Sequence, residues 1–127
     1  MTMTQVLCVE DEPDILEILT LALGLDPSIQ LRSASNGADG LALLDGADGW
    51  RPDVILLDVM MPDMDGPTTL EHIRGRPGLD QTPVIFLTAR AQSEDRTRLL
   101  GLGAVGVITK PFDPLTLARD IRSLLQG

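Results

Sequence analysis

The sequence predicts a doubly wound α/β fold, with five parallel strands in one sheet and helices on both of its faces. Short apolar runs alternate with segments of helical periodicity along the whole chain. The runs are continuously apolar, which is typical of strands buried on both faces, as in parallel sheets. Because the chain has 127 residues and shows no internal repeat or linker, we expect one domain to fill residues 1–127.

The predicted strands are short apolar segments rich in β-branched residues. They comprise residues 5–9, 29–34, 54–57, 84–87 and 105–108. Strands of this length that alternate with helices favour right-handed crossover connections, and therefore a parallel sheet.

The first two predicted helices follow the first two strands. Pro13, a residue favoured in a first helical turn, precedes Ile15 and Leu19 at helical spacing. Asn36 stands where it can cap a second helix that runs through Leu41.

The three remaining helices are predicted over residues 66–74, over residues 93–100, and from Pro114 through Leu125. Ser93 is the expected N-cap of the second of these. The last has the clearest pattern, with Asp113 as N-cap and Pro114 at the first helical position. Its apolar stripe consists of Leu117, Ile121, Leu124 and Leu125.

The composition argues against several classes of protein. The 19 Asp and Glu outnumber the 10 Lys and Arg, and the formal net charge of -9 disfavours nucleic-acid binding by this domain. No apolar run approaches the ~20 residues that cross a membrane, so we expect no membrane association. The single cysteine, Cys8, excludes an internal disulfide and fits a reducing compartment. We therefore expect a cytoplasmic protein.

Polar residues that could bind a ligand or take part in a reaction follow the apolar runs. In open parallel α/β sheets, ligands bind beyond the carboxyl ends of the strands. The residues at these ends are Glu10, Asp11 and Glu12 after the first run, Asp58 after the third, Thr88 after the fourth, and Thr109 and Lys110 after the fifth. The topology therefore predicts that carboxylates, a hydroxyl and the only lysine of the chain meet at one rim of the sheet.

This set of side chains suits phosphoryl transfer. Clustered carboxylates repel one another unless a cation neutralises them, and hard oxygen ligands favour Mg²⁺. Asp58 is a candidate metal ligand and a candidate nucleophile, because an aspartate can form an acyl phosphate. The Thr88 hydroxyl and the Lys110 ammonium can each hold a phosphoryl oxygen. A single acid after a strand is more often only a turn former or helix cap, so the prediction depends on the joint pattern.

Four segments resemble the motifs of the receiver domain of two-component response regulators. They are VEDEPD at residues 9–14, ILLDVMMPDMDG at 55–66, LTAR at 87–90 and TKPF at 109–112. The resemblance covers essentially the whole chain, and it implies a flavodoxin-like fold. It also implies phosphorylation-dependent signal transduction without a separate enzymatic activity, with a histidine kinase or a phosphotransfer protein as the phosphoryl donor.

The resemblance assigns a role to each site residue. Asp58 would be the phosphoacceptor, Thr88 and Ala89 would contact the phosphoryl oxygens, and Lys110 would pair with the phosphoryl group. The ligands of a Mg²⁺ ion, or of Mn²⁺ in its place, would be Glu10, Asp11, Asp58 and the backbone carbonyl of Met60. The Lys110–Pro111 peptide bond is expected to be cis, a form that is essentially confined to proline.

Two positions depart from the family pattern. Glu10 stands where the family more often has aspartate, and its longer side chain would alter the surroundings of the metal. Val107 stands three residues before the lysine, where the family usually has Tyr or Phe. Because valine has no ring to move inward on activation, transmission of the signal would depend on Thr88, on the loop around Arg90–Asp95 or on backbone shifts.

Several arginines lie on or near the last two predicted helices, close to the fifth predicted strand. Those on or near the last two helices are Arg90, Arg96, Arg98, Arg119 and Arg122. They form either a solvated face that balances an acidic protein or, with the fifth strand, a surface for a downstream target or for self-association. The sequence leaves both interpretations open.

Two other functions share part of this pattern. A phosphatase-like hydrolase of the haloacid dehalogenase type also forms an aspartyl phosphate, but it needs a second acid two residues after the nucleophile, where this chain has Met60. A degenerate receiver would act as a constitutive binding module. The intact set of Asp11, Asp58, Thr88 and Lys110 argues against it.

Overall fold

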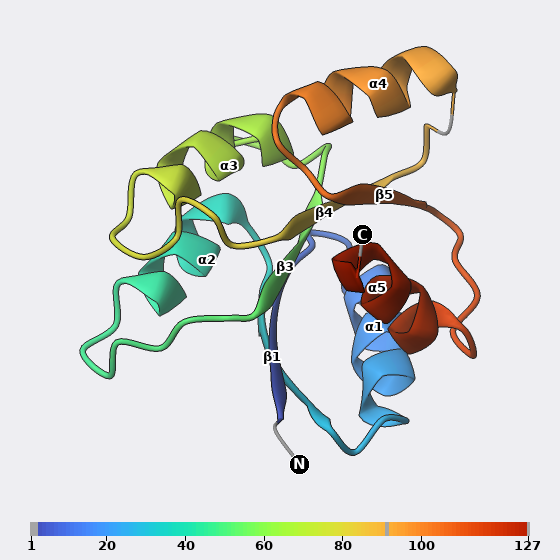
Figure 1. Ribbon diagram of the computed structural model, residues 1–127, viewed down its shortest axis with the longest axis horizontal. Coiled ribbons are helices and arrows are strands. Elements are labelled where there is room, and N and C mark those ends of the chain that lie inside the picture. The colour runs from blue at the N-terminus through green and yellow to red at the C-terminus, as the bar shows by residue number, and fades with distance from the viewer. Residues whose placement is uncertain (1–2, 91, 127) are drawn as a thin grey trace.

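The computed structural model describes residues 3–90 and 92–126, and it confirms a five-stranded parallel sheet with helices on both faces (Figure 1). The strands are β1 (Thr4–Val9), β2 (Ile29–Ala34), β3 (Val54–Asp58), β4 (Val84–Thr88) and β5 (Gly106–Thr109). The helices are α1 (Pro13–Gly24), α2 (Gly37–Leu44), α3 (Gly66–Arg74), α4 (Ser93–Gly101) and α5 (Leu117–Gln126). Within these residues, none of the helices is both long enough and apolar enough to cross a membrane.

The strand order across the sheet is β2-β1-β3-β4-β5, and all neighbouring strands are parallel. The chain first moves from β1 to one edge and then, after β2, returns past β1 to build the rest of the sheet. The order therefore reverses between β1 and β3, which is the topological switch point where open α/β sheets bind their ligands.

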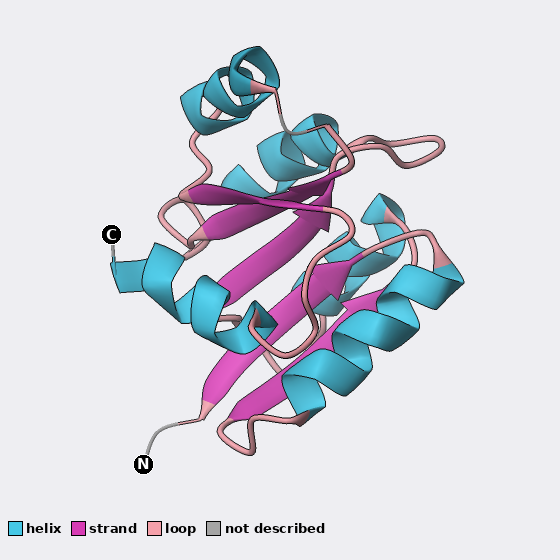
Figure 2. Ribbon diagram, turned by 90° about the vertical axis from the view of Figure 1, so that its right-hand side faces the viewer, coloured by secondary structure: helices cyan, strands magenta, loops and turns pink. Residues whose placement is uncertain are grey.

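The sheet lies between two layers of helices (Figure 2), and a separate buried core lies on each of its faces. Because successive side chains of a strand point to opposite faces, Leu7 belongs to the core under α2, α3 and α4, whereas Cys8 belongs to the core under α1 and α5. Val107 and Ile108 divide in the same way on β5. The strands are thus buried on both sides, which explains their continuously apolar sequences.

Two of the helices begin with side-chain caps. The Asn36 side-chain oxygen accepts a hydrogen bond from the backbone amide of Asp39 at 2.7 Å, which confirms the predicted cap of α2. The Asp65 carboxylate accepts from the amide of Thr68 at 2.8 Å at the start of α3. Each cap satisfies one of the amides that a first helical turn leaves without a partner.

The start of α3 lies directly against the end of β3. The Gly66 amide donates to the carbonyl of Val59 at 2.9 Å, and a Cβ at Gly66 would overlap the backbone carbonyl oxygen of Asp58. Glycine is therefore required here because two backbone segments approach each other too closely for any side chain. This contact fixes the loop that follows Asp58.

The prediction that Ser93 caps the fourth helix is wrong. Gln92 occupies the N-cap position without a side-chain hydrogen bond to the helix, and Ser93 is the first helical residue. The first turn instead contains Glu94 and Asp95, whose negative charges are favourable near the positive end of the helix dipole.

The last helix begins later than the sequence predicts, at Leu117 rather than at Pro114. The Asp113 carboxylate does accept a hydrogen bond from a backbone amide, that of Leu115, at 2.9 Å. The Asp113 carbonyl accepts from the amide of Thr116 at 3.1 Å. Asp113 therefore caps a tight turn that leads into α5 rather than the helix itself.

Arg122 lies on a different side of α5 from the one the sequence suggests. Its guanidinium donates to the Asp26 carboxylate at 3.0 Å and to the Ser28 hydroxyl at 2.7 Å, and it reaches the Thr4 hydroxyl at 3.3 Å. These contacts hold α5 against the connection between α1 and β2. Arg122 is therefore a structural residue and not part of a face formed by α4, β5 and α5.

Candidate functional site

The carboxyl ends of the strands bring the predicted acids and the lysine together. Lys110 Nζ lies 2.8 Å from Glu10 Oε1, 3.0 Å from Asp58 Oδ1 and 3.5 Å from Glu12 Oε1. The register explains this arrangement, because Val9 is opposite Leu57, which makes Glu10 and Asp58 neighbours across two adjacent strands. One cation therefore lies at the centre of several carboxylates.

Glu10, Asp11 and Asp58 form a tight carboxylate cluster. One oxygen from each lies within 4.8 Å of the others. Asp11 Oδ1 and Asp58 Oδ2 are buried and have no hydrogen-bond partner among the described residues. Buried anionic oxygens without donors are costly unless a cation binds them, and hard oxygen donors at this spacing fit a divalent ion such as Mg²⁺. The residues present therefore suit a metal site.

The electrostatics of Asp58 reflect this crowding. The residue is 2% exposed, and burial raises its pKa to about 8, with further upward contributions from Glu10 and Asp11. The hydrogen bond from Lys110 lowers the pKa of the same carboxyl group. Without a second cation, the cluster favours a proton on Asp58, because three close carboxylates cannot all ionise cheaply.

The neighbouring carboxylates also change the pKa of Lys110. Burial alone would lower the pKa of its ammonium, but the hydrogen bonds and charges of Glu10 and Asp58 outweigh burial and raise the pKa above its ordinary value. Lys110 is therefore charged at neutral pH. Because its side chain is only 10% exposed, that charge is far more effective than a charge on the surface.

Thr88 ends β4 next to this cluster. It is buried, and its hydroxyl oxygen accepts a hydrogen bond from the amide of Arg90 at 3.0 Å. The strand pairing sets Thr88 opposite Thr109, and the Lys110 amide donates to the Thr88 carbonyl at 2.8 Å. The hydroxyl and the lysine are thus carried by two paired strands, which holds them at a fixed separation.

The remaining predicted residues surround the cluster. Met60 is 72% exposed, so its side chain points to solvent and only its backbone offers a polar group. Ala89 is exposed next to Thr88. The Lys110–Pro111 peptide bond is cis, as expected. Each of these residues follows one of the strands that carry the acids, the threonine or the lysine.

Val107 is buried and belongs to the core under α2, α3 and α4. The same core contains Phe86, Leu99 and Ala104. A small branched side chain in this position fills part of the space beneath α4, and it has no polar group that could follow a hydroxyl or a charge. The structure therefore shows Val107 as a residue that packs in the core.

Glu12 is a site residue to which the sequence assigned no role. Its carboxylate lies near Lys110, and its amide donates to Glu10 Oε2 at 3.2 Å, which orients the Glu10 side chain. The signal was its place in the run of three acids after β1. Cys8, by contrast, is a buried core residue whose thiol pKa is raised by burial.

Comparison with known proteins agrees with this geometry. Residues 6–122 match the response regulator receiver domain family. The probable transcriptional regulatory protein TcrX of Mycobacterium tuberculosis is 38% identical over 122 residues, which are 95% of this chain and 49% of that protein. The chain thus spans about half the length of the curated relatives it matches.

Solved structures show the same fold. The chemotaxis response regulator CheY4 of Vibrio cholerae superposes with a TM-score of 0.85 at 32% identity, covering 97% of this chain and 99% of that one. The Mn²⁺-bound form of response regulator Rcp1 superposes with a TM-score of 0.79 at 26% identity, covering 94% of this chain and 92% of that one. The order of the strands, the acidic cluster at their ends and these matches lead to one conclusion: the chain belongs to the receiver domains of response regulators, the phosphorylation-dependent signalling modules of two-component systems.

Proposed function

We propose that Asp58 accepts a phosphoryl group from a histidine kinase or a phosphotransfer protein. The observation that supports this most directly is the position of its buried carboxylate, 3.0 Å from the only lysine of the chain and beside two further acids. An Asp58 oxygen attacks phosphorus, the P–N bond of a phosphohistidine breaks, and its electron pair returns to the imidazole nitrogen. The product is an acyl phosphate on Asp58.

Side chains of this chain stabilise that product. Lys110 neutralises one phosphoryl oxygen through its ammonium, which burial and its acidic neighbours keep charged. Thr88, whose hydroxyl lies at the same rim, donates to a second oxygen, and the backbone of Ala89, an exposed residue, is the third contact. Preorganised donors of this kind account for much of the catalysis of phosphoryl transfer.

Glu10, Asp11, Asp58 and the Met60 carbonyl are the proposed ligands of Mg²⁺, with Mn²⁺ as the alternative ion. When bound, the ion supplies positive charge that offsets the carboxylates and the phosphoryl oxygens. Glu10 also contacts Lys110 at 2.8 Å, so this residue links the metal ligands to the phosphoryl-binding lysine.

The signal is passed on through protein contacts at the face of α4, β5 and α5. This face adjoins Thr88 and Lys110 through the paired ends of β4 and β5, which supports a connection between the two. A downstream target or a second copy of the chain binds there, while the domain itself binds neither nucleic acid nor membrane and acts in the cytoplasm. Beyond its own phosphorylation and dephosphorylation, we assign it no catalytic activity.

Intact-mass measurement tests the proposal. Incubation with Mg²⁺ and acetyl phosphate adds one phosphoryl group, as the P–O bond of the donor breaks and acetate leaves. Chelation of the metal and the substitution Asp58→Asn both abolish this gain. Asp80→Asn, which makes the same change at an exposed position, leaves it intact. An unchanged mass would contradict the proposal, and multiple turnover of an unrelated phosphate ester would instead indicate a hydrolase.

A further inference from the structure

A cavity of about 280 Å³ lies between the residues that follow β3 and the helix α4. Val59 and Met60, the two residues after Asp58, line it, and so does Thr88 at the end of β4. The residues that α4 contributes to the lining are Asp95, Arg98 and Leu99. The cavity therefore borders both the surroundings of Asp58 and a helix that supplies no residue to the acidic cluster.

The charged side chains that line this cavity are mostly cationic. They are two arginines, Arg90 and Arg98, and one acid, Asp95. The lining thus carries one net positive charge, in a chain whose formal net charge is -9. A phosphoryl group carries about 1.5 to 2 negative charges near neutral pH. A cationic cavity next to Asp58 is therefore suited to an anion that forms there.

Arg98 has a guanidinium without a partner among the described residues. Its side chain is exposed and makes no ion pair or hydrogen bond with them, although Asp95 lies three residues before it on the same helix. The arginines that do pair with an aspartate are Arg32, Arg76, Arg119 and Arg122. The next residue, Leu99, is 1% exposed and packs in the core, which holds this turn of α4 in place. The guanidinium is thus free to bind an anion, while the backbone that carries it is fixed.

We propose that Arg98 extends its guanidinium through this cavity and binds the phosphoryl group of phosphorylated Asp58. Lys110 supplies a single compact charge, which Glu10 and Asp58 share in the unphosphorylated chain. A guanidinium can instead donate two parallel hydrogen bonds to the oxygens of one phosphoryl group. Arg98 therefore adds a contact to those of Lys110 and Thr88. This inference rests on the proposed function, because it concerns the phosphorylated form of the same site.

The contact connects the phosphoryl group with α4 without the participation of Val107. Val107 is buried in the core and has no polar group that could respond to a new charge. Arg98 responds to that charge directly, and its bound guanidinium holds α4 toward the end of β3. The gain in free energy is modest, because an exposed guanidinium gives up its hydration and its interactions are screened by salt.

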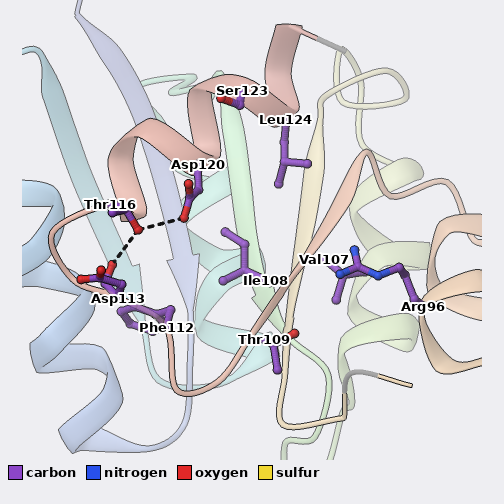
Figure 3. A pocket seen from close by; sticks show the side chains of 10 residues that line it. All are labelled: Arg96, Val107, Ile108, Thr109, Phe112, Asp113, Thr116, Asp120, Ser123 and Leu124. Carbon is purple, nitrogen blue, oxygen red and sulfur yellow. Dashed lines mark hydrogen bonds between the residues drawn. The ribbon is translucent and has the colours of Figure 1, made fainter. Parts of the chain in front are cut away.

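Arg96 offers a matched control for Arg98. It belongs to the same helix and is also exposed, but it lines a different cavity, where it lies beside Val107 (Figure 3). The two arginines therefore share charge, helix and exposure, and they differ in the cavity that they line. Substitution of either one by glutamine changes the net charge of the chain by the same amount.

Binding of beryllofluoride, an anion that mimics a phosphoryl group on aspartate, tests the proposal at equilibrium. Titrations followed by amide NMR in the presence of Mg²⁺ give the affinities of the wild type and of the variants. We expect Arg98→Gln to bind about three- to fivefold more weakly than the wild type, and Arg96→Gln to bind as the wild type does. High salt should reduce the difference between the wild type and Arg98→Gln, because it screens the charge of the arginine. Arg98→Lys, which keeps the charge but not the fork of donors, should recover part of the affinity.

The outcomes separate this inference from the proposed function. Equal affinities of the wild type and Arg98→Gln would overturn the inference alone. An equal loss in Arg96→Gln would overturn it too, because the effect would then depend only on net charge. A loss in Arg90→Gln with none in Arg98→Gln would assign the contact to the loop after β4 and refute the role of Arg98. Absence of beryllofluoride binding by the wild type would contradict the proposed function, and this inference with it.

Discussion

The Lys110 ammonium lies 3.0 Å from the Asp58 carboxylate, and the two residues are at the ends of strands that are separated by β4. The lysine therefore reaches the acid across the end of the intervening strand β4, whose last residue is Thr88. Asp58 has only this cation beside it among the described residues, while two further acids, Glu10 and Asp11, also lie close to it. The balance between one lysine and several acids determines how the site responds to pH and to substitution.

Asp58→Asn is expected to stabilise the protein in the presence of a chelator. The Asp58 pKa of about 8 is far above the ~3.9 of an unfolded aspartate, so the folded state binds more protons between these values. The wild type therefore loses stability as the pH rises from about 4 to about 8, and the variant loses less. Thermal unfolding should show an increase of about 3–6 °C near pH 8 and a smaller one near pH 5. An increase that is independent of pH would contradict this explanation.

Lys110→Met removes the cation and leaves the carboxylates facing one another. Breaking a buried ion pair in this way typically costs about 3–5 kcal/mol, and protonation of Asp58 can relieve part of it, so we expect a loss of about 2–3 kcal/mol near pH 8. Denaturant unfolding measures the loss. Combining Lys110→Met with Asp58→Asn should restore part of the stability, because the excess negative charge falls. Simple additivity of the two changes would show that the residues are not coupled.

Gly66→Ala is expected to displace the end of β3. The new Cβ overlaps the backbone oxygen of Asp58, and such overpacking typically costs about 1–3 kcal/mol. The rate of phosphorylation by acetyl phosphate should fall as well, since Asp58 moves with its backbone. Gly101→Ala is the matched control, because a Cβ at this position meets no other atom within 4 Å and α4 gains a better helix former. Wild-type rates in Gly66→Ala would show that the position of Asp58 does not depend on this contact.

Arg122→Gln should make the protein more sensitive to acid. Hydrogen bonds from Ser28 and Arg122 lower the pKa of Asp26 to about 2, so the folded state holds this carboxylate ionised more strongly than the unfolded state does. The stability it contributes is present above about pH 4 and is lost as the pH falls toward about 2. We expect the acid-unfolding midpoint of the variant to move to higher pH, by a small amount because Asp26 is at the surface. Circular dichroism across an acid titration measures it, and Arg119→Gln, a change at a more exposed position of α5, should leave the midpoint in place.

The sequence predicted the strands and the acidic rim well because a parallel sheet converts chain order into position. Once the apolar runs are taken as parallel strands, Glu10, Asp58, Thr88 and Lys110 must all lie at one edge. The start of the last helix was less predictable, since Asp113 and Pro114 are equally compatible with a capped turn and with a capped helix. The choice between them depends on packing against the rest of the chain.

Other features depend on contacts between residues that are distant in the sequence. Arg122 appeared to belong with the other arginines of the last two helices, but its pairing with Asp26 requires α5 to lie against the connection between α1 and β2. The close packing of α5 on β5 likewise depends on Gly106, where a Cβ would lie 2.6 Å from a methyl group of Leu124. No local pattern contains this information.

The division of the buried side chains by the sheet has a consequence for how such a domain can diverge. Different helices cover the two faces of the sheet. A substitution under α3 therefore leaves the packing of α1, on the opposite face, largely undisturbed. Two sets of surface contacts can therefore change independently during evolution, while the acids and the lysine at the rim stay the same. One chemical reaction can in this way be retained in many pathways that do not interfere with one another.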